Sequence, residues 1–314
     1  MKQIKGKLFL FAAFTLAGTS VISGYYLSNQ LGSFTIIAVS ICFVMLALLP
    51  IYGRKCIRAM HTMSFRDWMM IFLQAFFGIF MFRTFLLYGM KRTTAIEAGI
   101  LTGTTPAITS LMAFFILRER FSIKTVIGIL STVLGIMLLQ NLHLIGTNFP
   151  AAHLKGNLLV ICAAACESTF NIISRKHRSS AIKEKTVSLH PMVQTLFVSA
   201  VALILSFIPA AFEQPINALS VLSIQAWLSL FWYGVIATAV SFAFFYEGVK
   251  RCDAYTTAAF SGLMPLTAML LSIFLFKDSL QTSQCIGSAL IILSMILIGS
   301  NSSEEAANLS IEVS

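Results

Sequence analysis

Charged residues are scarce in this chain, and their scarcity excludes most soluble proteins. They make up 11% of its 314 residues, whereas an average soluble domain carries roughly 25%. So few charges cannot cover a water-exposed surface of this size. The net charge of +10 could suggest a nucleic-acid partner, but the Lys and Arg residues stand in short clusters between long apolar runs. That pattern is typical of a polytopic membrane protein.

The motifs of enzymes and metal sites are also missing. The sequence has no Walker A motif, no nucleophile elbow and no paired carboxylates at hydrolase spacing. Its six cysteines show no CxxC spacing and lie mostly in apolar segments, and His143, His153 and His190 lack ligand spacing. We therefore expect no enzyme activity, no metal and no cofactor. The energy for any transport would come from an ion or solute gradient.

Ten apolar stretches divide the chain, each close to the ~20 residues that a helix needs to cross about 30 Å of hydrocarbon. Continuously apolar runs favour helices over the alternating strands of a membrane barrel. The first stretch follows Lys2, Lys5 and Lys7 and also resembles a secretory signal. Because its removal would leave one half a helix short, we count it as a span. The expected spans are 8–28, 33–51, 69–89, 95–117, 123–140, 156–174, 189–209, 224–248, 254–276 and 283–300.

The distribution of Lys and Arg predicts the orientation of these spans. If the amino terminus is cytoplasmic, seventeen of them fall in cytoplasmic segments and four in outer loops, with Arg83 left inside a span. This bias fits the positive-inside rule. Ten spans then place both termini in the cytoplasm, and we expect residues 301–314 to form a disordered cytoplasmic tail.

The stretch from Gly89 to Gly135 recurs in the second half at a constant offset of 159 residues. The offset takes Gly89, Gly103 and Pro106 onto Gly248, Gly262 and Pro265 without a gap. Five spans in each half force the two halves to cross the membrane in opposite directions. We therefore expect an all-α integral membrane protein of ten transmembrane helices, built as two inverted five-helix repeats over 1–141 and 142–300. Such repeats are a recurring architecture of secondary transporters that work by alternating access.

The fourth and ninth spans carry the small residues and prolines of the repeat: Gly99, Gly103 and Pro106 in the first half, Gly262 and Pro265 in the second. Small residues four apart let helices approach closely, and each proline leaves a carbonyl unpaired near mid-membrane. Thr105 adds a hydroxyl at the first break. These positions could form a hinge or line a polar cavity, although membrane helices also use Gly and Pro for packing alone.

Two ionisable residues fall inside expected spans, where an unpartnered charge is costly. Arg83 lies some two-thirds through the third span, and Glu167 lies near the middle of the sixth, with Asn171 one turn further on the same face. The two charges could pair, or Glu167 could carry a coupling proton or meet a substrate amine while Arg83 meets a carboxylate. Arg83 could instead extend its side chain toward the outer interface, and Glu167 could form a purely structural ion pair or hydrogen bond.

The segment Gly103-Thr104-Thr105-Pro106, followed by Glu119, Gly128 and Gly135, resembles the EamA-type module of the drug/metabolite transporter superfamily. Gly262, Pro265, Asp278 and Gly287 resemble its second copy, and the likeness covers residues 8 to 300. The resemblance implies a carrier of small organic solutes, often an exporter of amino acids or other metabolites. Family members often show a Trp-Gly pair in the first span, an Arg in the second and a Trp in the sixth. Here Ala17-Gly18, a second span without Arg, and Glu167 occupy those places.

We therefore expect a multi-pass secondary transporter of the cell membrane that exports amino-acid-like or amphipathic metabolites by alternating access, with proton coupling as an option. Its expected partners are a small-molecule solute and the lipid bilayer, with a homodimer as a further option and no nucleic acid. The alternatives are an importer or lipid-linked solute flippase on the same fold, and a membrane sensor or assembly protein that does not transport.

Overall fold

The computed structural model describes residues 2–117, 122–139, 151–183, 190–249, 251, 260, 263–277 and 281–312, and these residues form helices joined by short turns without a strand. The first half contains α1 (Lys2–Ser28), α2 (Ser33–Met60), α3 (Phe65–Ala75), η1 (Phe76–Met81), α4 (Phe82–Met90), α5 (Ala95–Thr102), α6 (Thr105–Met112), η2 (Ala113–Leu117) and α7 (Ile123–Leu139). The second contains α8 (Ala151–Lys183), α9 (Pro191–Phe212), α10 (Pro215–Ser220), α11 (Ile224–Phe231), η3 (Trp232–Val240), α12 (Ser241–Val249), α14 (Leu263–Phe276) and α15 (Thr282–Glu312).

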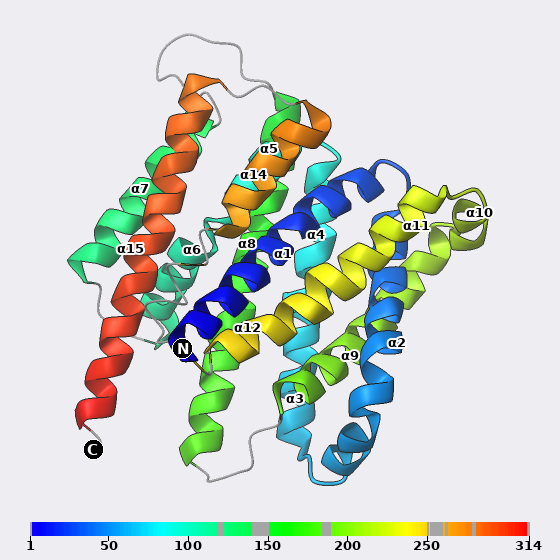
Figure 1. The fold of residues 1–314 in the computed structure, drawn as a ribbon, viewed down its shortest axis with the longest axis horizontal. Coiled ribbons are helices and arrows are strands. Elements are labelled where there is room, and N and C mark those ends of the chain that lie inside the picture. Colours follow the sequence, from blue (N-terminus) through cyan, green and yellow to red (C-terminus); the bar gives the residue numbers. More distant parts are fainter. Residues whose placement is uncertain are drawn as a thin grey trace.

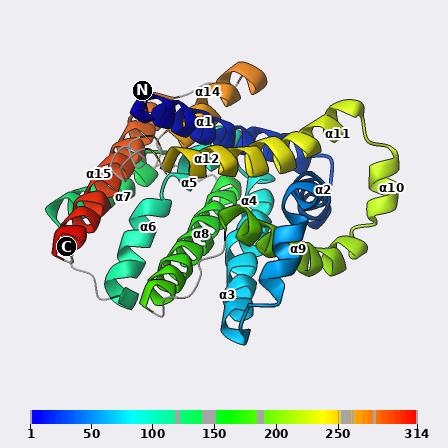
Figure 2. The same ribbon diagram turned by 60° about the horizontal axis from the view of Figure 1, so that its bottom comes forward.

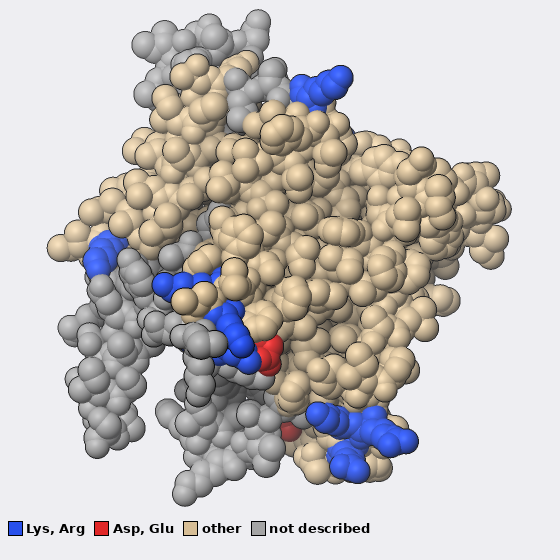
Figure 3. Space-filling view, in the orientation of Figure 1, with Lys and Arg blue, Asp and Glu red and all other residues tan. Residues whose placement is uncertain are grey.

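Seven of the helical segments are long and apolar enough to cross a membrane, and three more are apolar but shorter. The seven match the expected spans one to four and six to eight, and the shorter three, Ile123–Leu138, Leu263–Phe276 and Thr282–Ile298, match spans five, nine and ten. The membrane-spanning character of the chain is thereby supported, while the count of ten stays a prediction. Large apolar side chains are widely exposed, as they are in proteins that face lipid. In Figure 3 most of this face carries no charge, and the Lys and Arg groups lie at its top, on its left side near mid-height and near its lower edge.

Helices from the two halves pack against one another throughout the bundle. The helix α2 lies against α9, α7 against α15, and α5 against α14, and α1 contacts both α12 and α14. Figures 1 and 2 show the α7 and α15 pair at one side of the molecule and the α2 and α9 pair at the other. If Gly135 of α7 carried a Cβ atom, that atom would lie 2.8 Å from the carbonyl oxygen of Gly287 in α15. This contact brings two small residues of the expected repeats together, as close helix packing in membranes requires.

Helix starts follow from side chains that cap free backbone N–H groups. Ser64 and Asp67 form a capping box at α3, and the Thr94 side chain accepts a hydrogen bond from the backbone N–H of Glu97 at α5. The helix α15 continues past the expected tenth span to Glu312. The division into two repeats and a disordered tail stays a prediction.

Candidate functional site

The expected fourth span is broken into two helices at its middle. The helix α5 ends at Thr102, Gly103 and Thr104 form a turn, and α6 begins at Thr105. Pro106 therefore lies in the first turn of α6, where its missing N–H leaves no hydrogen bond unmade. The hydroxyls of Thr102, Thr104 and Thr105 each donate to the carbonyl three residues earlier, at 2.6, 2.7 and 2.9 Å. These bonds add hydroxyl donors to the carbonyls at the end of α5, where the Leu101 carbonyl also accepts the Thr104 backbone N–H at 3.0 Å.

Glu167 of α8 contacts this break directly. Its Oε2 atom lies 2.9 Å from the Thr105 hydroxyl. The neighbouring Ser168 hydroxyl is buried, and its one proton has two acceptors within reach, the Ala164 carbonyl at 2.8 Å and the Thr105 carbonyl at 3.1 Å. Asn171 is half-buried one turn further along α8. The structure thus brings Glu167 and Thr105 together and places Asn171 on the same side of α8.

Arg83 does not extend to the interface but is buried within the bundle, with 7% of its surface exposed. Its Nη1 atom donates to Ser40 Oγ at 3.0 Å and its Nη2 atom to Thr238 Oγ1 at 2.8 Å. The guanidinium carbon lies 4.6 Å from the centre of the Tyr233 ring, a cation–π distance. Arg83 therefore joins α4 to α2 and to η3 of the second half.

Arg83 and Glu167 lie at a similar depth but form no ion pair. A Cβ atom on Gly78 would meet the Phe170 ring, and one on Gly89 would meet Val160. The third expected span, which includes η1 and α4, thus runs antiparallel to α8, and Arg83 lies level with about residue 165 of α8. Glu167 is close to that level, yet it bonds to Thr105 of α6, whereas Arg83 bonds to α2 and η3. The pairing that the sequence left open is absent.

Two counterpart spans contain a wider, π-helical turn at the same register. The segment η1 covers Phe76–Met81, and the offset of 159 residues carries it onto 235–240, inside η3 (Trp232–Val240). A third such segment, η2, has its counterpart inside the ordinary helix α14. π-Helical turns loosen the backbone ladder and often mark functional sites. Nothing in the sequence pattern predicted them.

The small residues of the expected hinge lie at contacts between the halves. A Cβ atom on Gly99 would lie 2.6 Å from the Ala268 Cβ atom of α14, and one on Gly103 would lie 3.0 Å from the Ile291 side chain of α15. Pro265 is buried near the start of α14. Gly262 lies outside the described residues. The close approach of α5 and α14 thus depends on a residue without a side chain at position 99.

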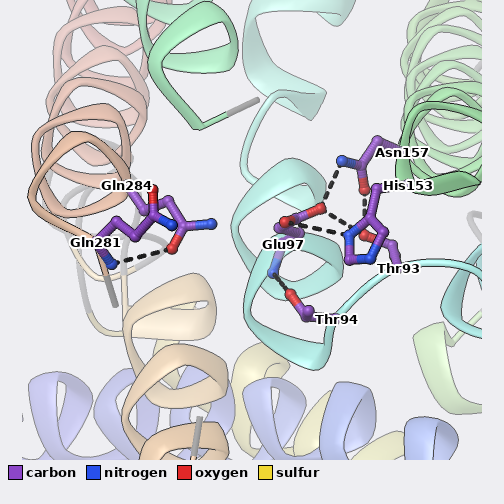
Figure 4. A network of polar contacts seen from close by, with 7 residues as sticks. All are labelled: Thr93, Thr94, Glu97, His153, Asn157, Gln281 and Gln284. Carbon is purple, nitrogen blue, oxygen red and sulfur yellow. Dashed lines mark hydrogen bonds and ion pairs between the residues drawn. The ribbon is translucent and has the colours of Figure 1, made fainter. Parts of the chain in front are cut away.

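A buried carboxylate, Glu97, forms a separate polar network where α5 begins. Only 6% of its surface is exposed, and its Oε2 atom accepts hydrogen bonds from Thr93 Oγ1 at 2.7 Å and Asn157 Nδ2 at 2.6 Å (Figure 4). His153 Nδ1 lies 3.6 Å from the Oε1 atom. Asn157 and His153 belong to the second half, so the network joins α5 to α8. A pairing between residues 60 apart has no local sequence signal.

The part of the chain that the structure describes contains no group of three His, Cys, Asp or Glu side chains placed to hold a metal ion. Its five described cysteines, Cys42, Cys56, Cys162, Cys166 and Cys285, form no disulfide. The polar groups described inside the bundle include hydroxyls, the amides of Asn171, Gln74 and Gln194, the Glu167 carboxyl and the Arg83 guanidinium. These groups can bind a solute or exchange a proton.

Comparison with known proteins identifies the family. The model of the EamA-like transporter family matches residues 4–140 and 154–300. The chain is 30% identical over 297 residues to "Uncharacterized transporter YetK" of Bacillus subtilis (strain 168), covering 93% of this chain and 86% of that protein. It is 19% identical over 306 residues to "WAT1-related protein At3g56620" of Arabidopsis thaliana, covering 91% and 79%.

A solved structure described as "Crystal structure of protein" superposes with a TM-score of 0.63 and 20% identity, covering 97% of this chain and 99% of the other. That likeness concerns the fold alone. The family match extends over most of the sequence and agrees with the resemblance in the Gly103-Thr104-Thr105-Pro106 segment. The chain belongs to the EamA-like transporter family.

Proposed function

We propose that this membrane transporter exports small organic metabolites, amino-acid-like or amphipathic, across the cell membrane by alternating access coupled to protons. Its ten spans would form two inverted repeats, residues 1–141 and 142–300, with both termini in the cytoplasm. The observation that carries the proposal is the contact of Glu167 with the broken fourth span. A carboxyl group bonded to a helix break can convert a change of protonation into a change of backbone geometry.

The hydroxyl of Thr105 gives this contact two states. It lies 2.9 Å from both the Thr102 carbonyl and Glu167 Oε2, and a hydroxyl has one proton to donate. When Glu167 is ionised, Thr105 donates to it. When Glu167 is protonated, the carboxyl donates to Thr105, whose own proton then bonds the Thr102 carbonyl. Protonation would thereby strengthen the bond that closes the end of α5.

The hinge in this mechanism lies where the two halves touch. The π-helical turns η1 and η3 at matching register give both halves a loosened span, and Gly99 and Gly103 permit close sliding contacts with α14 and α15. We assign hinge or cavity roles to Gly99, Gly103, Pro106, Gly262 and Pro265. We assign substrate or coupling roles to Glu167, Thr105, Asn171 and Arg83. Bistable packed contacts of this kind are what allow a small local change to move whole helices.

The experiment measures the efflux of a panel of amino acids and amphipathic metabolites from liposomes under an imposed pH gradient. It compares wild type, Glu167→Gln and the matched control Glu247→Gln. Glu247 pairs with Arg251 at 2.5 Å near the end of its span and lies away from the break. We expect the pH gradient to drive efflux in wild type and in Glu247→Gln but to lose its effect in Glu167→Gln. If Glu167→Gln responds to the gradient as wild type does, Glu167 does not couple protons. If wild type moves no solute of the panel, a sensor or assembly role replaces transport.

A further inference from the structure

Among the residues that the structure describes, only neutral groups hold the Arg83 guanidinium. Within the described residues its hydrogen bonds go to the Ser40 and Thr238 hydroxyls, and its face contacts the Tyr233 ring. Both hydroxyls already donate elsewhere, Ser40 to the Ile37 carbonyl at 3.0 Å and Thr238 to the Tyr233 carbonyl at 2.8 Å. Their protons are therefore turned away, and their oxygens face the guanidinium as acceptors. The arrangement positions the cation without neutralising it.

Each of the five carboxylates whose side chains the structure describes is engaged elsewhere. They are Asp67 in the α3 capping box, Glu97 with Asn157, Glu167 with Thr105, Glu213 at the start of α2, and Glu247 with Arg251. None lies within ion-pair distance of Arg83. A guanidinium buried in a membrane protein without a counter-charge is costly, and such residues commonly mark the path of a substrate or ion.

A purely structural role would not require this charge. A neutral amide could bond the same two hydroxyls, and the symmetry-related position in the second half is Phe242, which has no polar group at all. A guanidinium has five N–H donors in a planar fork, and two bonds to hydroxyls leave three N–H groups. The fork matches a planar carboxylate. One cation also balances one monoanion, whereas a phosphate dianion would call for a second.

We propose that Arg83 is the receptor for a carboxylate group of the transported solute, so that the substrates are organic acids or zwitterions and not simple amines. This inference rests on the transport function proposed above. The guanidinium is closed off in this structure, where α2 and η3 touch so tightly that a Cβ atom on Gly234 would lie 2.2 Å from the Ser40 carbonyl oxygen. The carboxylate would reach Arg83 when α2 and η3 separate at the π-helical turn.

The test uses solutes that differ only in their charged group: leucine, 4-methylpentanoate, which lacks the amine, and isoamylamine, which lacks the carboxylate. A parallel set carries a phenyl ring in place of the branched chain. Binding is measured on purified protein through ligand-induced thermal stabilisation, and flux is measured in liposomes. The variants are Arg83→Gln, which removes the charge, Arg83→Lys, which keeps it, and Arg58→Gln, which removes an exposed cation.

We expect wild type and Arg58→Gln to bind the carboxylates and discriminate against the amines. Arg83→Gln should weaken carboxylate binding on the order of 10- to 100-fold, and Arg83→Lys should recover part of it. If amines bind as well as carboxylates, if no carboxylate binds wild type, or if folded Arg83→Gln keeps the wild-type preference, the inference is wrong. Carboxylate binding that depends on Arg83 without any flux would uphold the anion site and refute transport. Should Arg83→Gln fail to fold, the comparison of carboxylate with amine in wild type and Arg83→Lys decides.

Discussion

The contact between Gly234 of η3 and Ser40 of α2 offers a strict test of the packing around Arg83. A Cβ atom at position 234 would lie 2.2 Å from the Ser40 carbonyl oxygen, 3.0 Å from its carbon and 3.2 Å from its Cα atom. The first distance is far below an ordinary contact, and the obstacle is backbone, which cannot rotate away. The Gly234→Ala change must therefore push α2 and η3 apart.

We expect this overpacking to lower the free energy of unfolding by about 1–3 kcal/mol, which corresponds to a fall in Tm of about 2–6 °C. The matched control is Gly53→Ala in α2, the helix that contains Ser40. The nearest atoms to a new Cβ atom at position 53 lie at 3.8 and 4.0 Å. There alanine should be neutral or stabilising by up to about 1 kcal/mol, because it is the better helix former. Displacing Ser40 should also weaken its bond to Arg83.

The assay is thermal unfolding of the purified variants in one detergent, followed by solute efflux from liposomes. We expect Gly234→Ala to melt below wild type and to transport more slowly, and Gly53→Ala to do neither. If Gly234→Ala melts at or above the temperature of Gly53→Ala, then α2 and η3 do not touch at Ser40. The position of Arg83 between them would then lose its support.

Two further changes test contacts between the halves. Asn157→Leu removes the donor that bonds the buried Glu97 carboxyl at 2.6 Å and should lower the free energy of unfolding by about 1.5–3 kcal/mol. His153→Gln, at the more exposed partner of Glu97, should change the thermal stability little. Equal effects of the two changes would contradict the network. Glu213 accepts the backbone N–H groups of Phe34 and Thr35 at 3.2 and 2.8 Å, so Glu213→Ala should cost about 1–2 kcal/mol as a lost helix cap. A Cβ atom on Gly32 would lie 2.0 Å from Glu213 Oε2, so the cost of Gly32→Ala should largely vanish when Glu213 is already alanine; additive effects in this double-mutant cycle would refute the contact.

The residues of the proposed mechanism divide into those that the sequence marked and those that it could not. Arg83 and Glu167 were found because a charge inside an apolar run stands out against its neighbours. Ser40, Thr238 and Tyr233 were missed because hydroxyls and aromatics are common in such runs, and only their approach to the guanidinium distinguishes them. Glu97 lies near a span end, where a carboxylate could reach water, yet Asn157 from a different span bonds to it.

The sequence by itself determined that the chain lies in a membrane, that it is helical, that a stretch of it recurs, and to which family it belongs. Each of these depends on composition or on local patterns: the length of apolar runs, the scarcity of charge, and the shared spacing of Gly103 and Pro106 with Gly262 and Pro265. Only the tertiary structure decided that Glu167 meets Thr105 at the break in the fourth span, and that Arg83 lies buried without a carboxylate partner among the described residues. The physical reason is that lipid requires every span to be apolar, whichever helix it will contact. The choice of polar partner therefore depends on packing between distant segments.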